Sequence, residues 1–168
     1  MSVLLVVPDS ALGRSIAARL VQQGDEVRAI EAETAAGSAL ADLGVHVGRG
    51  PYLDADLIER AGQNCRTVVV IDQSEAALSE VVSGMRAARI PRLIVCADRI
   101  APQILEVVTG SGLEYVILRS PRGLLRRGPS DDEIAEAVDA ADDLAGELKL
   151  DLDLGEAGAW TALGLERA

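Results

Sequence analysis

The chain has 168 residues, enough to bury one core but too few for a cofactor domain plus a full substrate domain, so we expect a single domain over residues 1–168. The sequence has no Phe, one Trp and two Tyr, and a core built instead from Val, Ile, Leu and Ala is typical of buried parallel strands between small-residue helices. The net charge of −11 arises in the tail, where residues 131–168 hold 12 acidic and two basic side chains, and this acidity excludes nucleic acid as a main partner.

No apolar run approaches the roughly 20 residues that span a bilayer, and no signal peptide follows Met1. We therefore expect a cytoplasmic protein with no membrane insertion. Cys65 and Cys96 are isolated in or beside apolar runs, which favours buried, reduced thiols over a redox or metal site.

Strand and helix patterns alternate from the first residues onward. Val3–Val7 is a short apolar run typical of a buried strand, a helical period runs from Leu12 to Gly24, and Glu26–Ile30 predicts a second strand. The later predicted strands are Val45–Val47, Thr67–Ile71, Arg92–Ala97 and Tyr115–Leu118, and the later predicted helices are Thr34–Leu43, Asp54–Ala61, Ser74–Ala88 and Ala101–Val108. This alternation predicts an α/β, Rossmann-like, doubly wound and mainly parallel sheet with helices on both faces.

Residues 123–168 differ in pattern from the predicted nucleotide-binding-type core of residues 1–122. Ser130 and Glu133 have the spacing of a capping box at the start of an acidic helix. Four leucines then alternate with charged residues over 148–154, which predicts a half-buried C-terminal edge strand. We expect this strand to extend the sheet and Trp160, in a C-terminal helix, to fold back and cover it.

The turn after the first strand is where a Rossmann fold holds pyrophosphate against a helix N-terminus. The G-x-G-x-x-G spacing falls on Pro8, Ser10 and Gly13, so only the third glycine is present. Gly13 still permits close packing of helix and strand, but Pro8 offers no N–H, Ser10 adds a side chain, and Asp9 adds a like charge. This degenerate glycine motif predicts weak or lost binding.

Two charged residues near this turn have two interpretations each. Arg14 either offsets the charge of Asp9 or is a solvated surface arginine. Glu31 either accepts from the adenosine ribose hydroxyls, which slightly favours NAD over NADP, or is a solvated carboxylate. The candidate cofactor-binding residues are Ser10, Leu12, Gly13, Arg14, Glu31 and Asp72, and we identify no catalytic or metal-binding residue.

The run Val3–Ile30, with its Gly13-Arg14 pair and the segment Gly24–Ala29, resembles the opening of NmrA-like, atypical short-chain dehydrogenase/reductase proteins. Three later segments are similar to the third, fifth and sixth strand regions of that family, namely Leu43–Val47, Ile90–Val95 and Ser111–Arg119. The resemblance covers about residues 3–122. It implies a Rossmann-like sheet that binds NADP or NAD in a reductase or redox-sensing role.

Part of the same stretch also resembles the nucleotide-binding domain of potassium-conductance regulators. Gly13–Ala17, Glu31 and Asp54–Gly62 carry this second likeness. The two families share a fold, and the sixth strand region and the acidic extension favour the first.

Several chemistries lack their residues. Short-chain reductases use a Tyr-x-x-x-Lys pair, but the only lysine is Lys149, with no tyrosine four residues before it, and we interpret Tyr115 as a core residue. The single histidine, His46, is interpreted as a buried or edge residue because one histidine cannot build a histidine-rich metal site. The sequence also lacks the G-x-S-x-G and G-K-[ST] motifs of serine hydrolases and P-loop proteins.

An arginine cluster, Arg119, Arg122, Arg126 and Arg127, follows the sixth predicted strand. It is either a clamp for an anion or cofactor phosphate or a set of partners for the acidic helix Asp131–Glu147, and we favour the second interpretation.

Three functional hypotheses follow. The first is an NAD(P)-binding-type Rossmann domain that binds weakly or not at all and acts as a non-catalytic sensor, with a protein partner or as a homodimer. The second is a small NAD(P)-dependent oxidoreductase of the NmrA-like kind. The third is a nucleotide-binding regulatory subunit of a membrane transporter.

Overall fold

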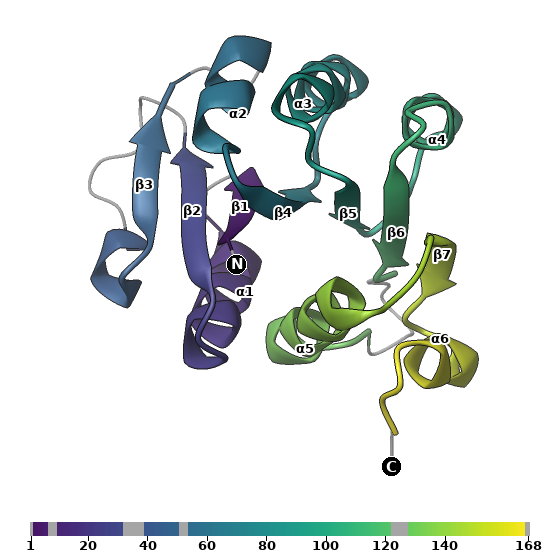
Figure 1. Cartoon of the computed structure of the whole chain (residues 1–168). Coiled ribbons are helices and arrows are strands. Elements are labelled where there is room, and N and C mark those ends of the chain that lie inside the picture. Colours follow the sequence, from purple (N-terminus) through teal and green to yellow (C-terminus); the bar gives the residue numbers. More distant parts are fainter. Residues whose placement is uncertain (1, 7–9, 32–38, 51–53, 122–127, 167–168) are drawn as a thin grey trace.

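Strands and helices alternate along the whole described chain (Figure 1). The computed structural model describes residues 2–6, 10–31, 39–50, 54–121 and 128–166. The strands are β1 (Ser2–Val6), β2 (Glu26–Glu31), β3 (His46–Arg49), β4 (Cys65–Ile71), β5 (Arg92–Ala97), β6 (Glu114–Arg119) and β7 (Lys149–Asp153). The helices are α1 (Ala11–Gln22), α2 (Ala55–Ala61), α3 (Glu75–Ala88), α4 (Pro102–Thr109), α5 (Asp131–Asp143) and α6 (Ala157–Ala162). None of these helices is long and apolar enough to cross a membrane.

The strands form one seven-stranded sheet in the order β3-β2-β1-β4-β5-β6-β7, and every neighbouring pair runs parallel. Helices α1, α5 and α6 cover one face, and α2, α3 and α4 cover the other (Figure 1). This confirms the predicted α/β Rossmann-like, doubly wound architecture with a C-terminal edge strand.

Successive strand residues serve opposite faces, because side chains alternate along a strand. Val3 and Leu5 of β1 pack with Ile16 and Leu20 of α1. Leu4 and Val6 belong to the other cluster, with side chains of α2, α3 and α4. Both faces of the central strands are therefore buried, which explains why these strands are continuous apolar runs in the sequence.

One predicted helix is wrong over its described part. Of the predicted range Thr34–Leu43, residues 34–38 lie outside the described residues, and the rest holds only a 3₁₀ turn at Ala41–Leu43. Gly44, at φ 84°, ends this turn, and the chain enters β3 two residues later. A left-handed glycine ends helices of any length, so this stop signal is consistent with the single turn as well as with the longer helix that the pattern predicts.

The C-terminal segment completes the fold as predicted. The Ser130 side chain accepts from the Glu133 N–H and the Glu133 carboxylate accepts from the Ser130 N–H, so the capping box of α5 forms. Strand β7 pairs with β6 at the sheet edge. Trp160 is 3% exposed, and its indole N–H donates to the Leu154 carbonyl at 3.0 Å.

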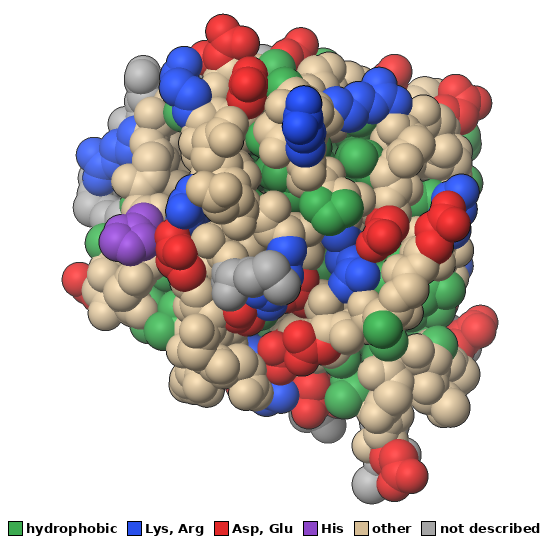
Figure 2. Space-filling model, in the orientation of Figure 1, with side chains coloured by type: hydrophobic (Ala, Val, Ile, Leu, Met, Phe, Trp, Pro, Cys, Tyr) green, Lys and Arg blue, Asp and Glu red, His purple; other side chains and the backbone are tan. Residues whose placement is uncertain are grey.

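A buried carboxylate ties α5 to the sheet at the end where the strands begin. The Asp142 side chain is 1% exposed and accepts from the Thr67 hydroxyl and the Arg66 guanidinium. Arg66 also donates to both oxygens of Asp25, at 2.8 and 2.9 Å, and Arg92 donates to the Asp142 backbone carbonyl. Figure 2 shows basic and acidic side chains side by side on this face, around the start of β1. The hydrogen bonds to Asp25 and Asp142 raise the Arg66 pKa above its usual range.

Replacing Asp142 should therefore be costly. Asp142→Ala leaves the buried Thr67 hydroxyl without its acceptor and Arg66 with Asp25 alone, and we expect it to lower the free energy of unfolding by about 1–3 kcal/mol. Urea denaturation followed by circular dichroism measures the change. The control is Asp143→Ala at the exposed neighbouring position, which should stay within about 0.5 kcal/mol of the parent; equal effects of the two variants would contradict the assigned role of Asp142.

Gly84 is where α3 crosses α2 closely. A Cβ placed on Gly84 would lie 2.5 Å from the Ile58 Cβ and 2.6 Å from the Ala55 carbonyl oxygen. Because backbone must move to relieve this, we expect Gly84→Ala to destabilise the protein by about 1–3 kcal/mol in thermal or urea unfolding. Gly158→Ala, in α6 with open space around it, should instead be neutral or stabilise by up to about 1 kcal/mol through helix propensity. A Gly84→Ala protein as stable as Gly158→Ala would show that the two helices are not in close contact.

Candidate functional site

The carboxyl ends of β1 and β4 define a switch point in the sheet. The two strands are neighbours, but the chain leaves β1 into α1 on one face and leaves β4 into α3 on the other. Ligands of open α/β sheets bind at such an edge, because the diverging connections leave a crevice there. Two adjoining cavities occupy this part of the protein.

The first, which we call the switch-point cavity, has a volume of about 180 Å³ and lies on the α1 side. Its lining residues come from the starts of α1 and α5 and from the ends of β4, β5 and β6, and they are Ser10, Ala11, Leu12, Ile71, Asp72, Cys96, Ala97, Asp98, Ser120 and Asp131. The cavity thus brings together three of the candidate cofactor-binding residues, Ser10, Leu12 and Asp72.

Ser10 caps α1. Its hydroxyl oxygen accepts from the Gly13 N–H at 3.0 Å, so one of the donors at this helix end is already used. The first N–H groups of a helix have no intrahelical acceptor, which leaves those of Ala11 and Leu12 as the donors for an anion. Gly13 itself is buried inside α1.

Three carboxylates line the same cavity. Asp72 follows β4 in a left-handed conformation, at φ 46°, with its N–H donating to the Cys96 carbonyl at 3.0 Å. Asp98 follows β5 and accepts from the Ser120 hydroxyl at 3.3 Å, and Asp131 is the first residue of α5. An anion at the α1 N-terminus would therefore meet negative charge from several sides. Sequence reasoning missed Asp98 and Asp131, although Asp98 directly follows a predicted strand.

Two other candidate residues lie outside this cavity. Glu31 ends β2 with 1% exposure, so its interpretation as a solvated carboxylate is wrong. Its register neighbour is Arg49, the exposed last residue of β3. Arg14 lines a different cavity, between α1 and α5, together with Asp132. Pro8 and Asp9 of the glycine motif lie outside the described residues.

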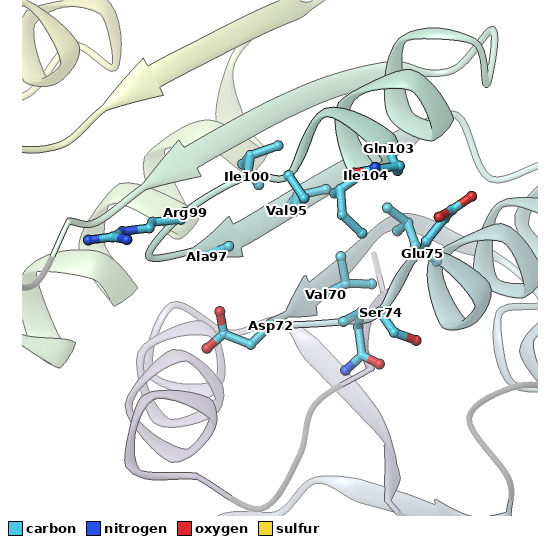
Figure 3. Close-up of a pocket in the computed structure, with 13 residues that line it drawn as sticks. Val70, Asp72, Ser74, Glu75, Val95, Ala97, Arg99, Ile100, Gln103 and Ile104 are labelled. Carbon is cyan, nitrogen blue, oxygen red and sulfur yellow. The ribbon is translucent and has the colours of Figure 1, made fainter.

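The second cavity, which we call the β4–β5 cavity, has a volume of about 450 Å³ and lies on the opposite side of the sheet edge, between the starts of α3 and α4. It shares Asp72 and Ala97 with the switch-point cavity. Figure 3 shows Val70, Val95 and Ile104 gathered at its centre. Sequence reasoning did not find this cavity, because the space forms only where the starts of α3 and α4 pack beside the ends of β4 and β5.

The arginine cluster does not behave as predicted where it is described. Arg119 pairs with Asp151 of β7 at 2.7 Å, not with the acidic helix, because the parallel register brings the two strands side by side. Arg122, Arg126 and Arg127 lie outside the described residues. Arginines from elsewhere contact α5 instead: Arg19 lies 2.9 Å from Asp139, and Arg66 and Arg92 bind at Asp142.

The two cysteines, His46 and Tyr115 all lie in strands of the sheet. Both cysteines are buried, as predicted. His46 is exposed on the edge strand β3, and Tyr115 packs partly buried against the cluster under α2, α3 and α4. Among the described residues, no group of His, Cys, Asp and Glu has the arrangement to hold a metal ion.

The fold is similar to that of several solved reductases. A short-chain dehydrogenase/reductase of Veillonella parvula in complex with NADP is 17% identical, with 94% of this chain and 96% of that chain covered and a TM-score of 0.72. An NADPH-dependent quinone oxidoreductase of Escherichia coli, complexed with NADPH, is 16% identical over 96% of this chain and 76% of its own, with a TM-score of 0.74. The triphenylmethane reductase of Citrobacter sp. with NADP(H) is 16% identical over 88% and 68%, with a TM-score of 0.70.

At these identities the similarity shows the fold, a Rossmann-like α/β sheet of the kind that the short-chain dehydrogenase/reductase resemblance implies. No family model and no curated protein matches the sequence.

The Cys96 thiol, in the wall of the switch-point cavity, should be inert in the native protein. Burial, followed by the negative charge of Asp72, raises the pKa of Cys96 from 9.0 to about 12. The unfolded chain forms thiolate from about pH 9 upward and the folded one only near 12, so this contribution to stability is lost as pH rises between these values. We expect iodoacetamide to label Cys96 only after unfolding, as read by mass spectrometry, and Cys96→Ala to show a flatter loss of stability at alkaline pH. Rapid labelling of Cys96 in the native protein at pH 8 would contradict its burial.

Proposed function

We propose that the chain is a nicotinamide-dinucleotide-binding Rossmann domain of the reductase type, with weakened affinity for the pyrophosphate. The observation that carries the proposal is the pair of adjoining cavities at the switch point, one open to the α1 N-terminus and the other extending away over β4 and β5. The three solved relatives named above carry NADP or NADPH in a similar fold, which supports the choice of ligand.

The residues present fit the dinucleotide in part. The N–H groups of Ala11 and Leu12 would hold the pyrophosphate, Glu31 lies toward the adenosine side, and the β4–β5 cavity lies toward the nicotinamide side. When bound, the reduced cofactor supplies a hydride. Asp72, Asp98 and Asp131 add carboxylates to the wall of the switch-point cavity, and negative charge there opposes an anion.

The choice between the two dinucleotides rests on the end of β2. Glu31 favours NAD, because a carboxylate there repels a 2′-phosphate. Arg49, its neighbour on β3, would instead attract a 2′-phosphate and favour NADP. Titration of both cofactors decides between them.

The reductases of similar fold support an NAD(P)-dependent oxidoreductase better than a non-catalytic sensor. Among the described lining residues of the two cavities there is no Tyr, His or Lys that could donate a proton to a reduced carbonyl. Steady, protein-dependent oxidation of NADH or NADPH with a panel of quinones and aldehydes would establish an oxidoreductase, and its absence would favour a domain that only binds the cofactor.

Calorimetric titration with NAD, NADH, NADP and NADPH tests the proposal. We expect dissociation constants in the high micromolar range, near −5 to −6 kcal/mol. Because the carboxylates repel the ligand, the affinity should rise between about 20 and about 200 mM NaCl, as salt screens that repulsion. Phosphate sites lined by basic residues show the opposite salt dependence.

Asp72→Asn isolates the charge, since asparagine tolerates the left-handed backbone at this position. We expect Asp72→Asn to tighten dinucleotide binding by about tenfold and to reduce its dependence on salt. The control is Asp143→Asn, which changes an exposed carboxylate at the end of the sheet where the strands begin and should alter neither quantity. A wild-type affinity below about 1 μM that weakens with salt would overturn the proposed weak, repulsive site.

A further inference from the structure

The β4–β5 cavity is large enough to hold a molecule of its own. Its volume of about 450 Å³ falls in the range of sites that enclose small ligands. Val70, Leu78 and Val95, which are buried, and the half-buried Ile104 form its apolar walls. Branched aliphatic side chains from two strands and two helices thus enclose a space between β4 and β5.

The polar groups of the cavity lie at its rim, and three of them, Gln73, Ser74 and Gln103, are neutral hydrogen-bonding groups. Ser74 caps α3 by accepting from the Ala77 N–H at 3.3 Å, and its hydroxyl proton remains available to donate. Gln103, in the first turn of α4, carries both a donor and an acceptor. Either side chain can hydrogen-bond a carbonyl or hydroxyl oxygen of a ligand.

The charges at the rim exclude an anion. Asp72 and Glu75 are acidic, and Figure 3 shows the guanidinium of Arg99 directed away from the apolar centre. A carboxylate or phosphate that moved from water into the cavity would lose its hydration. Because the Arg99 guanidinium is directed away from the apolar centre, it would not offset this desolvation cost.

We propose that the β4–β5 cavity binds a neutral, flat compound of one or two rings that carries a carbonyl or hydroxyl group. Its ring system lies against Val70, Val95 and Ile104, and its oxygen lies toward Ser74 and Gln103. The shared residues Asp72 and Ala97 place this ligand next to the switch-point cavity, so its role as the hydride acceptor rests on the proposed function.

Methyl NMR of the full chain, labelled at isoleucine, tests this assignment with α-tetralone as the probe. Of the ten isoleucines, only Ile100 and Ile104 line the β4–β5 cavity, and Ile71 lines the switch-point cavity. We expect saturable shifts of the Ile100 and Ile104 methyl groups. The anion α-naphthoate, which has two rings and similar size, should bind at least about tenfold more weakly.

Two variants locate the binding. Ala97→Leu fills the cavity from its wall and should weaken α-tetralone binding by at least about tenfold, whereas Ala88→Leu, the same change at a half-buried position of α3 outside both cavities, should leave it unchanged. Gln103→Ala, at an exposed position in the first turn of α4, should weaken binding several-fold without affecting the fold. No saturable shift of Ile100 and Ile104, equal binding of α-naphthoate, or an unchanged affinity in Ala97→Leu would each overturn the proposal.

The experiment separates this proposal from the proposed function. Addition of a dinucleotide should shift Ile71, and its failure to do so would count against dinucleotide binding while the α-tetralone shifts still stood.

Discussion

The buried Asp142 carboxylate fixes where α5 lies, and much of the structure depends on that position. Because Asp142 binds Arg66 and Thr67 at the start of β4, the last turn of α5 is held against the sheet. The reciprocal Ser130 and Glu133 cap defines where the helix begins, and α5 packs along α1. In this position α5 covers the α1 side of the core, places Asp131 at the switch-point cavity, and directs the chain into β7. One helix, held where the strands begin, therefore contributes to the wall of the switch-point cavity at the carboxyl ends of the strands.

At the carboxyl ends of the strands, the backbone favours binding of an anion, whereas the side chains oppose it. The start of α1 offers N–H groups and a positive dipole end to an anion, but Asp72, Asp98 and Asp131 stand around it. On the other side of the same edge, the β4–β5 cavity has an apolar centre with polar groups at its rim. The architecture suits a dinucleotide, whereas the charges favour neutral groups.

The sequence predicts the sheet well because each buried parallel strand is a short run of branched apolar residues between recognisable turns. Ser74 and Ser130 mark helix starts by the same chemistry that caps them in the structure. Over residues 39–43 the helix prediction is wrong because Gly44 can end a helix or a single 3₁₀ turn alike, so the stop signal does not show which of them precedes it.

The site was predictable only in part. Ser10, Leu12 and Asp72 follow strands, so topology alone brings them to one edge. Asp131 reaches that edge only through the packing of α5 on α1, and the partner of Arg119 depends on the register between β6 and β7. Neither arrangement is visible in local sequence patterns, because both depend on contacts between distant segments.

The central place of β1 has a consequence for synthesis of the chain. Translation produces β1 and α1 first, yet Ile16 and Leu20 of α1 share their core with Ile134 and Val138 of α5, which are made near the end. The α2, α3 and α4 side can close once β6 has formed, but the α1 side stays open until α5 leaves the ribosome. Long-range closure of this kind is slow and exposes apolar surface meanwhile. The apolar surface on the α1 face of the nascent sheet therefore stays exposed to solvent until α5 has been made, whereas the other face can be covered earlier.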